Sequence, residues 1–135
     1  MSKSRQKGTY FETEVVNYLK EHRVVNATRL PMSSPLGDID GTGVVLECKN
    51  QKTMTLAAWV DQAAKASEVA QRRFFVIHKR PRKNVSEAYV TFALKDLPGL
   101  LVLLQANSMG PGVDPYDTIM ETVRPLVREK RESHP

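Results

Sequence analysis

The sequence predicts an α/β domain built on a central mixed β-sheet with helices against its faces. Apolar residues recur at helical spacing over residues 9–21 and 56–70, and short runs of β-branched and aromatic residues lie between and after these segments. The chain has 135 residues, of which 41% are hydrophobic, so it is long enough to bury one core. We expect residues 1–108 to form this domain and residues 109–135 to form a helical extension packed on it.

The first half of the chain predicts one helix and three strands. Residues 9–21 form the helix, and residues 24–30 follow as the first strand. The apolar residues of the helix are Phe11, Val15, Val16, Tyr18 and Leu19. The sequence "DID" at 38–40 and the run at 44–50 predict two further strands. The "GTG" between them predicts a tight turn, so we expect these two strands to form a hairpin.

The second half predicts a helix, two strands and a final helix. Residues 56–70 form the helix, and "FFVIH" at 74–78 predicts a central strand from its aromatic and β-branched content. Residues 89–94 predict the last strand, and the very apolar segment 97–106 is either core or a subunit interface. A break at "MGPG" precedes a helix that begins near Asp114.

Two charged residues, Glu47 and Lys49, interrupt the apolar run at 44–50. Side chains alternate between the two faces of a strand, so Glu47 and Lys49 share one face and Cys48 lies with the core on the other. Burial of an unpaired charge is costly or shifts its pKa, so something must compensate these side chains. A structural ion pair, a wet sheet edge and a functional site are the alternatives that this strand leaves open.

Two aspartates upstream of this strand favour a functional site. Asp38 and Asp40 lie on one face of the short strand at 38–40, and the predicted hairpin brings them toward Glu47 and Lys49. Two or three carboxylates and a lysine then meet at one end of the sheet. Clustered carboxylates repel one another, and clusters of oxygen ligands of this kind are typical of Mg²⁺ sites.

These acidic residues resemble the motifs of a nuclease superfamily. "GDI" followed by "ECK" resembles the Asp…Glu-x-Lys signature of the PD-(D/E)xK nucleases, and residues 7–80 are similar to the Holliday-junction resolvases of archaeal and phage type. The further matching residues are Lys7, Gly8, Glu12, Arg29, Ser33, Ser34, Gln62 and Ala63. Gly37 stands where a proline often precedes the family's aspartate, which leaves both Asp38 and Asp40 open as the matching residue.

The resemblance implies a restriction-endonuclease-like fold and a Mg²⁺-dependent endonuclease, with Mn²⁺ as the alternative metal. It implies that the metal is held by Glu12, Asp38, Glu47 and the carbonyl of Cys48. By the same resemblance, Lys49 orients the attacking water or stabilises the transition state, and Gln62 and either Ser33 or Ser34 make further contacts. The implied substrate is a four-way DNA junction in recombination or repair, and its two-fold symmetry implies a C2 homodimer.

The helix at 9–21 contains two glutamates, of which Glu12 is the better candidate. Glu12 has Val15, Val16 and Leu19 at helical spacing and so borders the core face, whereas Glu14 faces outward. Glu12 could also be no more than an acid in the first helical turn, where the helix dipole favours negative charge.

Three basic segments predict contacts with the backbone of DNA, and the chain carries a net charge of +5. These segments, all expected as loops, are "KSRQK" near the N-terminus, "QRR" at 71–73 and "HKRPRKN" at 78–84. Each alone is as readily a solvated surface, but together they suit a substrate that an acidic site would otherwise repel. The DNA-binding candidates are Lys7, Arg29, Ser34, Arg72, Arg73, Lys79, Arg80, Arg82 and Lys83.

Other classes of protein are disfavoured by what the sequence lacks. No apolar run approaches the ~18 residues of a membrane span, and no signal peptide is expected, so we expect a cytoplasmic protein. The single cysteine allows no intrachain disulfide, and the three histidines show no metal-ligand spacing. Two alternatives to a resolvase remain, namely another structure-specific or repair nuclease of the superfamily and a non-catalytic DNA-binding module.

Overall fold

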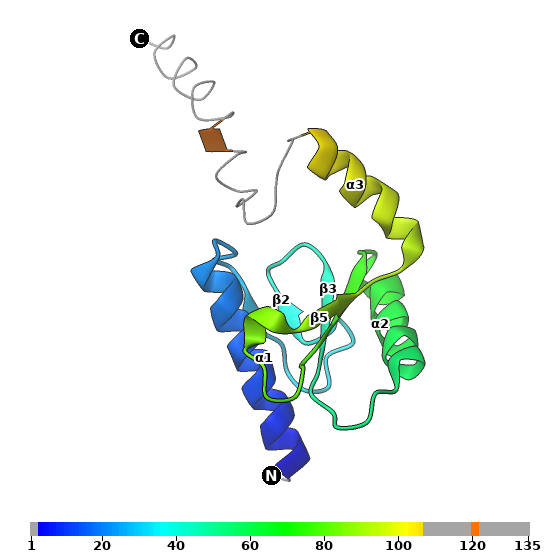
Figure 1. The fold of residues 1–135 in the computed structure, drawn as a ribbon. Helices are drawn as coiled ribbons and strands as arrows, with labels where there is room; N and C mark the ends of the chain where they lie inside the picture. Colours follow the sequence, from blue (N-terminus) through cyan, green and yellow to red (C-terminus); the bar gives the residue numbers. More distant parts are fainter. Residues whose placement is uncertain (1–2, 107–119, 122–135) are drawn as a thin grey trace. The chain divides into compact units, whose positions relative to one another are not determined.

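The computed structural model of the chain describes residues 3–106 and 120–121 (Figure 1). The chain divides into two compact units between Leu94 and Lys95, and each is described by itself. The predicted domain boundary at residue 108 and the helix expected near Asp114 lie outside the described residues, as does the predicted extension apart from residues 120–121.

The first unit is an α/β domain with a mixed sheet of five strands in the order β1-β2-β3-β4-β5. The strands are β1 (Thr28–Arg29), β2 (Ile39–Asp40), β3 (Val45–Lys49), β4 (Phe74–His78) and β5 (Tyr89–Thr91). Strands β1, β2 and β3 pair antiparallel in succession, β3 pairs parallel with β4, and β4 pairs antiparallel with β5. The predicted α/β class with a mixed central sheet is confirmed.

Two helices flank the central strand β3 on opposite faces. Helix α1 (Lys3–Glu21) and helix α2 (Leu56–Ala70) both contact β3. The core under α1 consists of Phe11, Val15, Val16, Ala27, Ile39, Leu46 and Cys48. The core under α2 consists of Val45, Trp59, Ala63, Ala66, Phe74 and Val76. Alternate residues of β3 therefore enter alternate cores, which confirms the two faces predicted for this strand.

Most predicted elements are present, but several are shorter or longer than expected. The bounds of α2 and β4 are those predicted, whereas α1 begins at Lys3 rather than at residue 9. The segment "KSRQK", predicted as a loop, is therefore helical, because lysine, arginine and glutamine are good helix formers and Gly8 costs only about 1 kcal/mol. The first and last strands keep only two and three paired residues, and a short 3₁₀ helix, Leu94–Asp96, follows the last one.

The hairpin of β2 and β3 depends on two glycines. Gly37 has φ +98°, and a Cβ atom on it would lie 2.9 Å from the carbonyl oxygen of Leu46. Gly41 has φ +81°, and its Cβ would lie 2.0 Å from the carbonyl oxygen of Asn26. Proline fixes φ near −65°, so it could not occupy position 37 in this conformation. Gly37 is thus the residue type that the left-handed position before β2 requires, packed against the backbone of β3.

The second unit begins with α3 (Leu97–Ala106), the very apolar segment of the sequence. Its residues from Leu101 to Ala106 are all exposed within the described structure, and exposed fractions reach 66% at Val102. The prediction of core or subunit interface for this segment therefore stays a prediction. Among the described residues, no helix is long and apolar enough to cross a membrane.

Candidate functional site at the end of the central strands

The candidate site lies where β3 and β4 end, next to the residue that precedes β2. The backbone N–H of Asp38 donates to the carbonyl of Leu46 over 2.8 Å, which sets its register beside β3. The Asp38 Oδ2 atom accepts a hydrogen bond of 2.7 Å from the backbone N–H of Cys48. The carboxylate of Asp38 therefore takes the place of the next rung of the sheet ladder, and it is held at the strand end by the backbone.

The structure distinguishes the two aspartates left open by the sequence. Asp40 is exposed and pairs with Thr28 between β1 and β2, away from the end of β3. Asp38 is half-buried and contacts Glu47 through a side-chain hydrogen bond. Of the two, Asp38 is the one whose carboxyl group joins the predicted acidic site.

Glu47 is the most perturbed acid of the described chain. Its residue is 4% exposed, so its carboxyl group lies in the interior of the domain. Burial and, after it, the negative charge of Asp38 raise the pKa of Glu47 to about 7, although the charge of Lys49 opposes the rise. The Glu47 carboxyl group therefore keeps its proton to a higher pH than an exposed glutamate does.

Lys49 forms a hydrogen bond with Gln62, which the family resemblance also implies as a site residue. Its Nζ atom donates to Oε1 of Gln62 on α2 over 2.6 Å. An ammonium group can only donate, so the amide oxygen of Gln62 must face Lys49 and the amide nitrogen is left as a donor on the other side. Lys49 and Gln62, each predicted separately as a site residue, are thus brought together on the face of β3 that α2 covers.

Glu12 reaches the site from α1, where it is paired with Arg29. The Arg29 Nε and Glu12 Oε2 atoms are 3.1 Å apart, and 14% of the Glu12 side chain is exposed. Burial and the charge of Asp38 raise the pKa of Glu12, against the effects of Arg29 and Lys49. Arg29, predicted to contact DNA, is here the ion-pair partner of a predicted metal ligand.

The expectation that Glu14 faces outward is not met in full. The Glu14 Oε1 atom is buried and has no hydrogen-bond partner among the described residues. The prediction compared Glu12 and Glu14 only by their neighbours on the same helix. It could not take account of other elements that pack against α1. Glu12, not Glu14, is nevertheless the glutamate whose charge acts on Asp38 and Glu47.

The donors at this site fit a hard divalent cation in chemistry, but their side chains do not converge. Among the described residues, no group of three or more His, Cys, Asp or Glu side chains is assembled as a metal site. The three carboxylates come from different elements: Glu12 from α1, Asp38 from the residue that precedes β2, and Glu47 from β3 itself. Burial and the charge of Asp38 raise the pKa of Glu47, and a bound cation would offset both effects.

The carbonyl of Cys48 is placed to join these carboxylates. The N–H and C=O groups of one strand residue point to the same side, and the Cys48 N–H points to Asp38. Its thiol belongs to the core under α1, and burial raises the pKa of this thiol well above its usual range. Cys48 is therefore a buried structural residue that could offer a backbone oxygen, as the sequence predicts.

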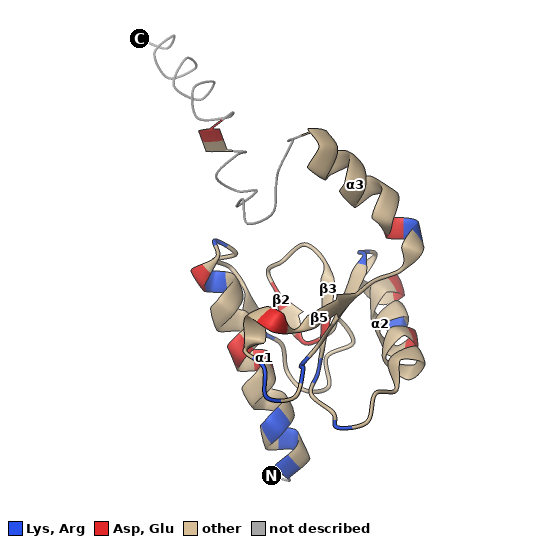
Figure 2. Cartoon of the chain, in the orientation of Figure 1, with Lys and Arg blue, Asp and Glu red and all other residues tan. Residues whose placement is uncertain are grey.

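Predicted DNA contacts fall into two groups in the structure. The backbone N–H of Lys79 donates to the carbonyl of Lys49 over 2.9 Å, so the basic loop that follows β4 lies beside the end of β3. Figure 2 shows this end of the domain, where α1 begins, with Lys and Arg on the helix and on the neighbouring loops. Of the predicted residues, Lys7, Lys79, Arg80, Arg82 and Lys83 belong to this end.

Arg72 and Arg73 belong to the other end of the parallel strands. The Arg73 carbonyl accepts from the N–H of Val45, the first residue of β3, which is ~13 Å along the strand from Lys49. The chain returns through α2 before β4 starts, so residues that precede β4 lie far from those that follow β3. The structure thus does not bring these two arginines to the carboxylates.

The predicted serines precede Asp38 in a tight loop. The Ser34 N–H donates to the Pro31 carbonyl over 2.9 Å, and the Ser34 Oγ accepts from the N–H of Leu36 over 3.1 Å. Ser34 therefore shapes the loop, whereas Ser33 is exposed on it. Of the two, Ser33 has the more accessible hydroxyl group for a ligand.

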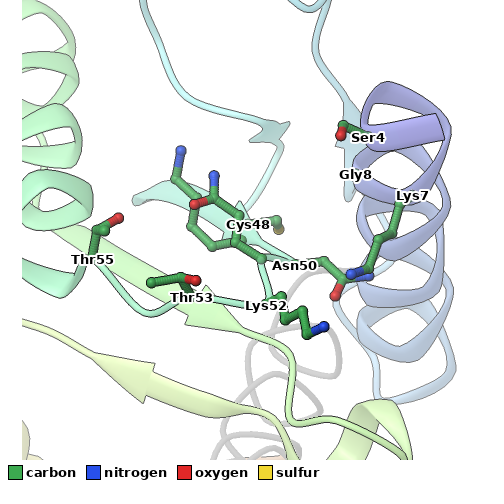
Figure 3. A pocket seen from close by; sticks show the side chains of 10 residues that line it. Ser4, Lys7, Gly8, Cys48, Asn50, Lys52, Thr53 and Thr55 are labelled. Atoms are coloured by element: carbon green, nitrogen blue, oxygen red, sulfur yellow. The ribbon is translucent and has the colours of Figure 1, made fainter. Parts of the chain in front are cut away.

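Residues that sequence reasoning missed line a cavity of about 510 Å³ at this end (Figure 3). The cavity extends from α1 to the loop after β3, and its lining includes the predicted residues Lys7, Cys48 and Lys49. The missed residues are Ser4, Asn50, Gln51, Lys52, Thr53 and Thr55. Their signal in the sequence was position alone, because "NQKT" follows the Glu-x-Lys motif directly.

A buried histidine backs the site. His78, the last residue of β4, is 5% exposed, and its Nε2 atom lies 2.9 Å from Oγ1 of Thr91. Its ring contacts Trp59 and Tyr89, and burial lowers the pKa of the imidazole. His78 therefore packs as a neutral, hydrogen-bonded core residue.

Comparisons with known proteins add no relative to this description. No protein-family model, curated protein or solved structure matches the chain. The resemblance to the PD-(D/E)xK nucleases therefore rests on the motifs quoted from this sequence. The functional proposal has to be carried by the residues of the site.

Proposed function

We propose that the protein is a metal-dependent endonuclease with a restriction-endonuclease-like fold that hydrolyses phosphodiester bonds of DNA. One observation carries the proposal: the Asp38 carboxyl group, held by the Cys48 N–H over 2.7 Å, and the buried Glu47 lie together at the end of β3, beside the hydrogen-bonded Lys49 and Gln62. A purely structural ion pair would leave Glu47 ionised by Lys49. Here the charge of Asp38 affects the pKa of Glu47 more than the charge of Lys49 does, which favours a site that binds a cation.

The proposed metal ligands are Asp38, Glu47 and the carbonyl of Cys48. A bound Mg²⁺ would supply Lewis-acid chemistry at the phosphate and a water of lowered pKa. Glu12 would be a further ligand or a proton acceptor, and Arg29 holds its side chain in reach of the site. Mg²⁺ keeps several of its waters, so two carboxylates and one carbonyl are a sufficient protein contribution.

Lys49 is the proposed transition-state cation. Its ammonium group is fixed by Gln62, so little side-chain freedom is lost when a phosphate binds beside it. It then donates to a phosphate oxygen as negative charge develops there. Gln62 is a positioning residue in this proposal, because it acts through Lys49.

DNA is the proposed substrate because Lys and Arg surround the carboxylates at this end of the domain (Figure 2). Contacts with the phosphate backbone supply affinity without reading sequence. The four-way junction and the C2 homodimer come from the family resemblance. Another structure-specific nuclease would use the same site residues. The substrate panel described next therefore decides between that nuclease and a junction resolvase.

The test is to incubate the purified chain with labelled four-way junction, duplex and single-stranded DNA, with and without Mg²⁺. The proposal expects Mg²⁺-dependent cleavage, with the junction cut in preference to the duplex. Cleavage of another branched or single-stranded substrate in preference to the junction would favour the alternative nuclease. Binding without cleavage in Mg²⁺ or Mn²⁺ would identify the protein as a DNA-binding module and overturn the enzymatic proposal.

A further inference from the structure

Two neighbouring cavities at the proposed site are lined by cations and neutral donors. The cavity of about 510 Å³ adjoins the end of β3, and a second one of about 290 Å³ is lined from the loop after β4. They share Lys7, Asn50, Gln51 and Lys52, so they are two halves of one surface. Within the described chain, no Asp or Glu lines either half.

We infer that this surface is a subsite for two consecutive phosphates of a nucleic-acid strand, separate from the phosphate that is cut. This inference rests on the proposed function and extends it to residues that the family motifs do not include. The shared wall supplies Lys7 from α1 and Lys52 from the loop after β3. The larger half ends at Lys49, the cation proposed for the cut phosphate, and the smaller half adds Lys79 and Arg82.

The distribution of charge favours a chain of phosphates over a single anion. Two cationic side chains, Lys7 and Lys52, stand on the wall that the two halves share, and each half has a further cation at its outer end. A lone anion would occupy one half and leave the cations of the other half repelling one another. Two linked phosphates would place one negative charge in each half, with Lys7 and Lys52 in reach of both. Figure 3 shows Lys7 reaching from α1 toward Asn50 across the larger half.

The neutral residues of the lining also present donors. The indole Nε1–H of Trp59 donates to Oε1 of Gln51 over 3.3 Å. Because an indole N–H can only donate, the amide oxygen of Gln51 is committed to Trp59, and its NH₂ group is left to donate elsewhere. Hydroxyl groups of Ser4, Thr53 and Thr55 add donors to the larger half. A phosphate accepts from all of these groups.

Trp59 makes the subsite observable without any cleavage. It is the single tryptophan of the chain, it is 4% exposed, and its hydrogen bond ends on a residue that lines both halves. Occupation of the cavities should change its fluorescence. The titration uses the full chain in EDTA, with sodium tripolyphosphate in one arm and a short oligothymidylate in the other, so it is independent of metal chemistry.

We expect both ligands to give a saturable change in Trp59 fluorescence. Lys52→Ala and Lys7→Ala should each weaken binding on the order of tenfold, and each should lower the salt dependence of oligonucleotide affinity by about one ion. The matched control is Lys65→Ala, which removes the same charge from the exposed face of α2 and lines neither cavity. It should bind both ligands within twofold of the wild type.

Four results would overturn the inference: no saturable response to either ligand, an equal loss in Lys65→Ala, binding of tripolyphosphate without the oligonucleotide, or wild-type binding by Lys52→Ala. The outcome is separable from that of the proposed function. If the chain is a DNA-binding module, it will show no Mg²⁺-dependent cleavage but will still bind both ligands in the EDTA titration. A nuclease whose Lys52→Ala variant binds like the wild type would keep the proposed function and lose the subsite.

Discussion

The raised pKa of Glu47 makes a quantitative prediction about stability. A carboxyl group whose pKa is about 7 in the folded chain and 4.5 in its usual state stays protonated on folding over this interval, while the unfolded chain loses its proton. The folded state then binds more protons than the unfolded one, so the free energy of unfolding falls as pH rises from about 4.5 to 7. At about 1.4 kcal/mol for each tenfold change in proton affinity, the loss is about 3 kcal/mol.

Glu47→Gln isolates this contribution. Glutamine keeps the shape and can still donate to Asp38, but it has no proton to lose. The variant should therefore gain about 3 kcal/mol relative to the wild type between pH 4.5 and pH 8 without Mg²⁺. The pKa of Glu12 is also raised and that of His78 is lowered, so both profiles contain further slopes. The difference between the two profiles cancels the common part.

The assay is urea unfolding of the full chain at several pH values, in EDTA. Asp40→Asn serves as the control, because Asp40 is exposed and its loss should leave the slope unchanged. Added Mg²⁺ should restore wild-type stability at pH 8, because a cation offsets the repulsion, and it should do so less in Glu47→Gln. If the unfolding free energies of the wild type and Glu47→Gln changed in parallel with pH, the raised pKa of Glu47 by burial and by the charge of Asp38 would be refuted.

Three further predictions concern the chemistry. Lys49→Ala should fold and bind a junction like the wild type but cleave it on the order of 10²-fold more slowly, as measured in a single-turnover assay at matched melting temperature; a near wild-type rate would remove Lys49 from the mechanism. Excess EDTA should abolish cleavage and leave junction affinity in a gel-shift assay, and cleavage that persisted would exclude the metal. Arg29→Ala should raise the pKa of Glu12 further, since Arg29 opposes that rise, and an NMR titration of the side-chain carboxyl would detect the change or its absence.

Local patterns predicted the parts of the fold that depend on neighbouring residues. Helix α2 and strand β4 have the predicted bounds because apolar spacing and β-branched content each extend over a whole element. The hairpin and the alternation of Glu47 and Lys49 with Cys48 followed from a glycine turn and the two-residue period of a strand. The position of Asp38 beside Glu47 required no more than this hairpin.

What the sequence could not supply depends on residues far apart in the chain. Arg29 and Glu12 are 17 positions apart, and no local pattern indicates that they form an ion pair. The sequence therefore predicted Arg29 only as a DNA contact. The sequence of a basic segment does not indicate at which end of the sheet the segment lies. Because β3 and β4 are parallel and joined through α2, Arg73 lies at the end of the strands opposite Lys49. The role of Lys52 in lining two cavities became visible only when α1 and the loop after β4 were placed around it.

The central claim is that Asp38 belongs to a metal-dependent site that cuts DNA. Its most direct test is the single-turnover cleavage rate of a labelled junction in Mg²⁺, measured for Asp38→Asn beside Asp40→Asn, with melting temperature and junction affinity as controls. Both variants remove one negative charge from the same hairpin, but only Asp38 reaches Cys48 and Glu47. We predict a loss on the order of 10²-fold or more for Asp38→Asn and a loss of less than about tenfold for Asp40→Asn. A folded, junction-binding Asp38→Asn variant that cut at the wild-type rate would contradict the account.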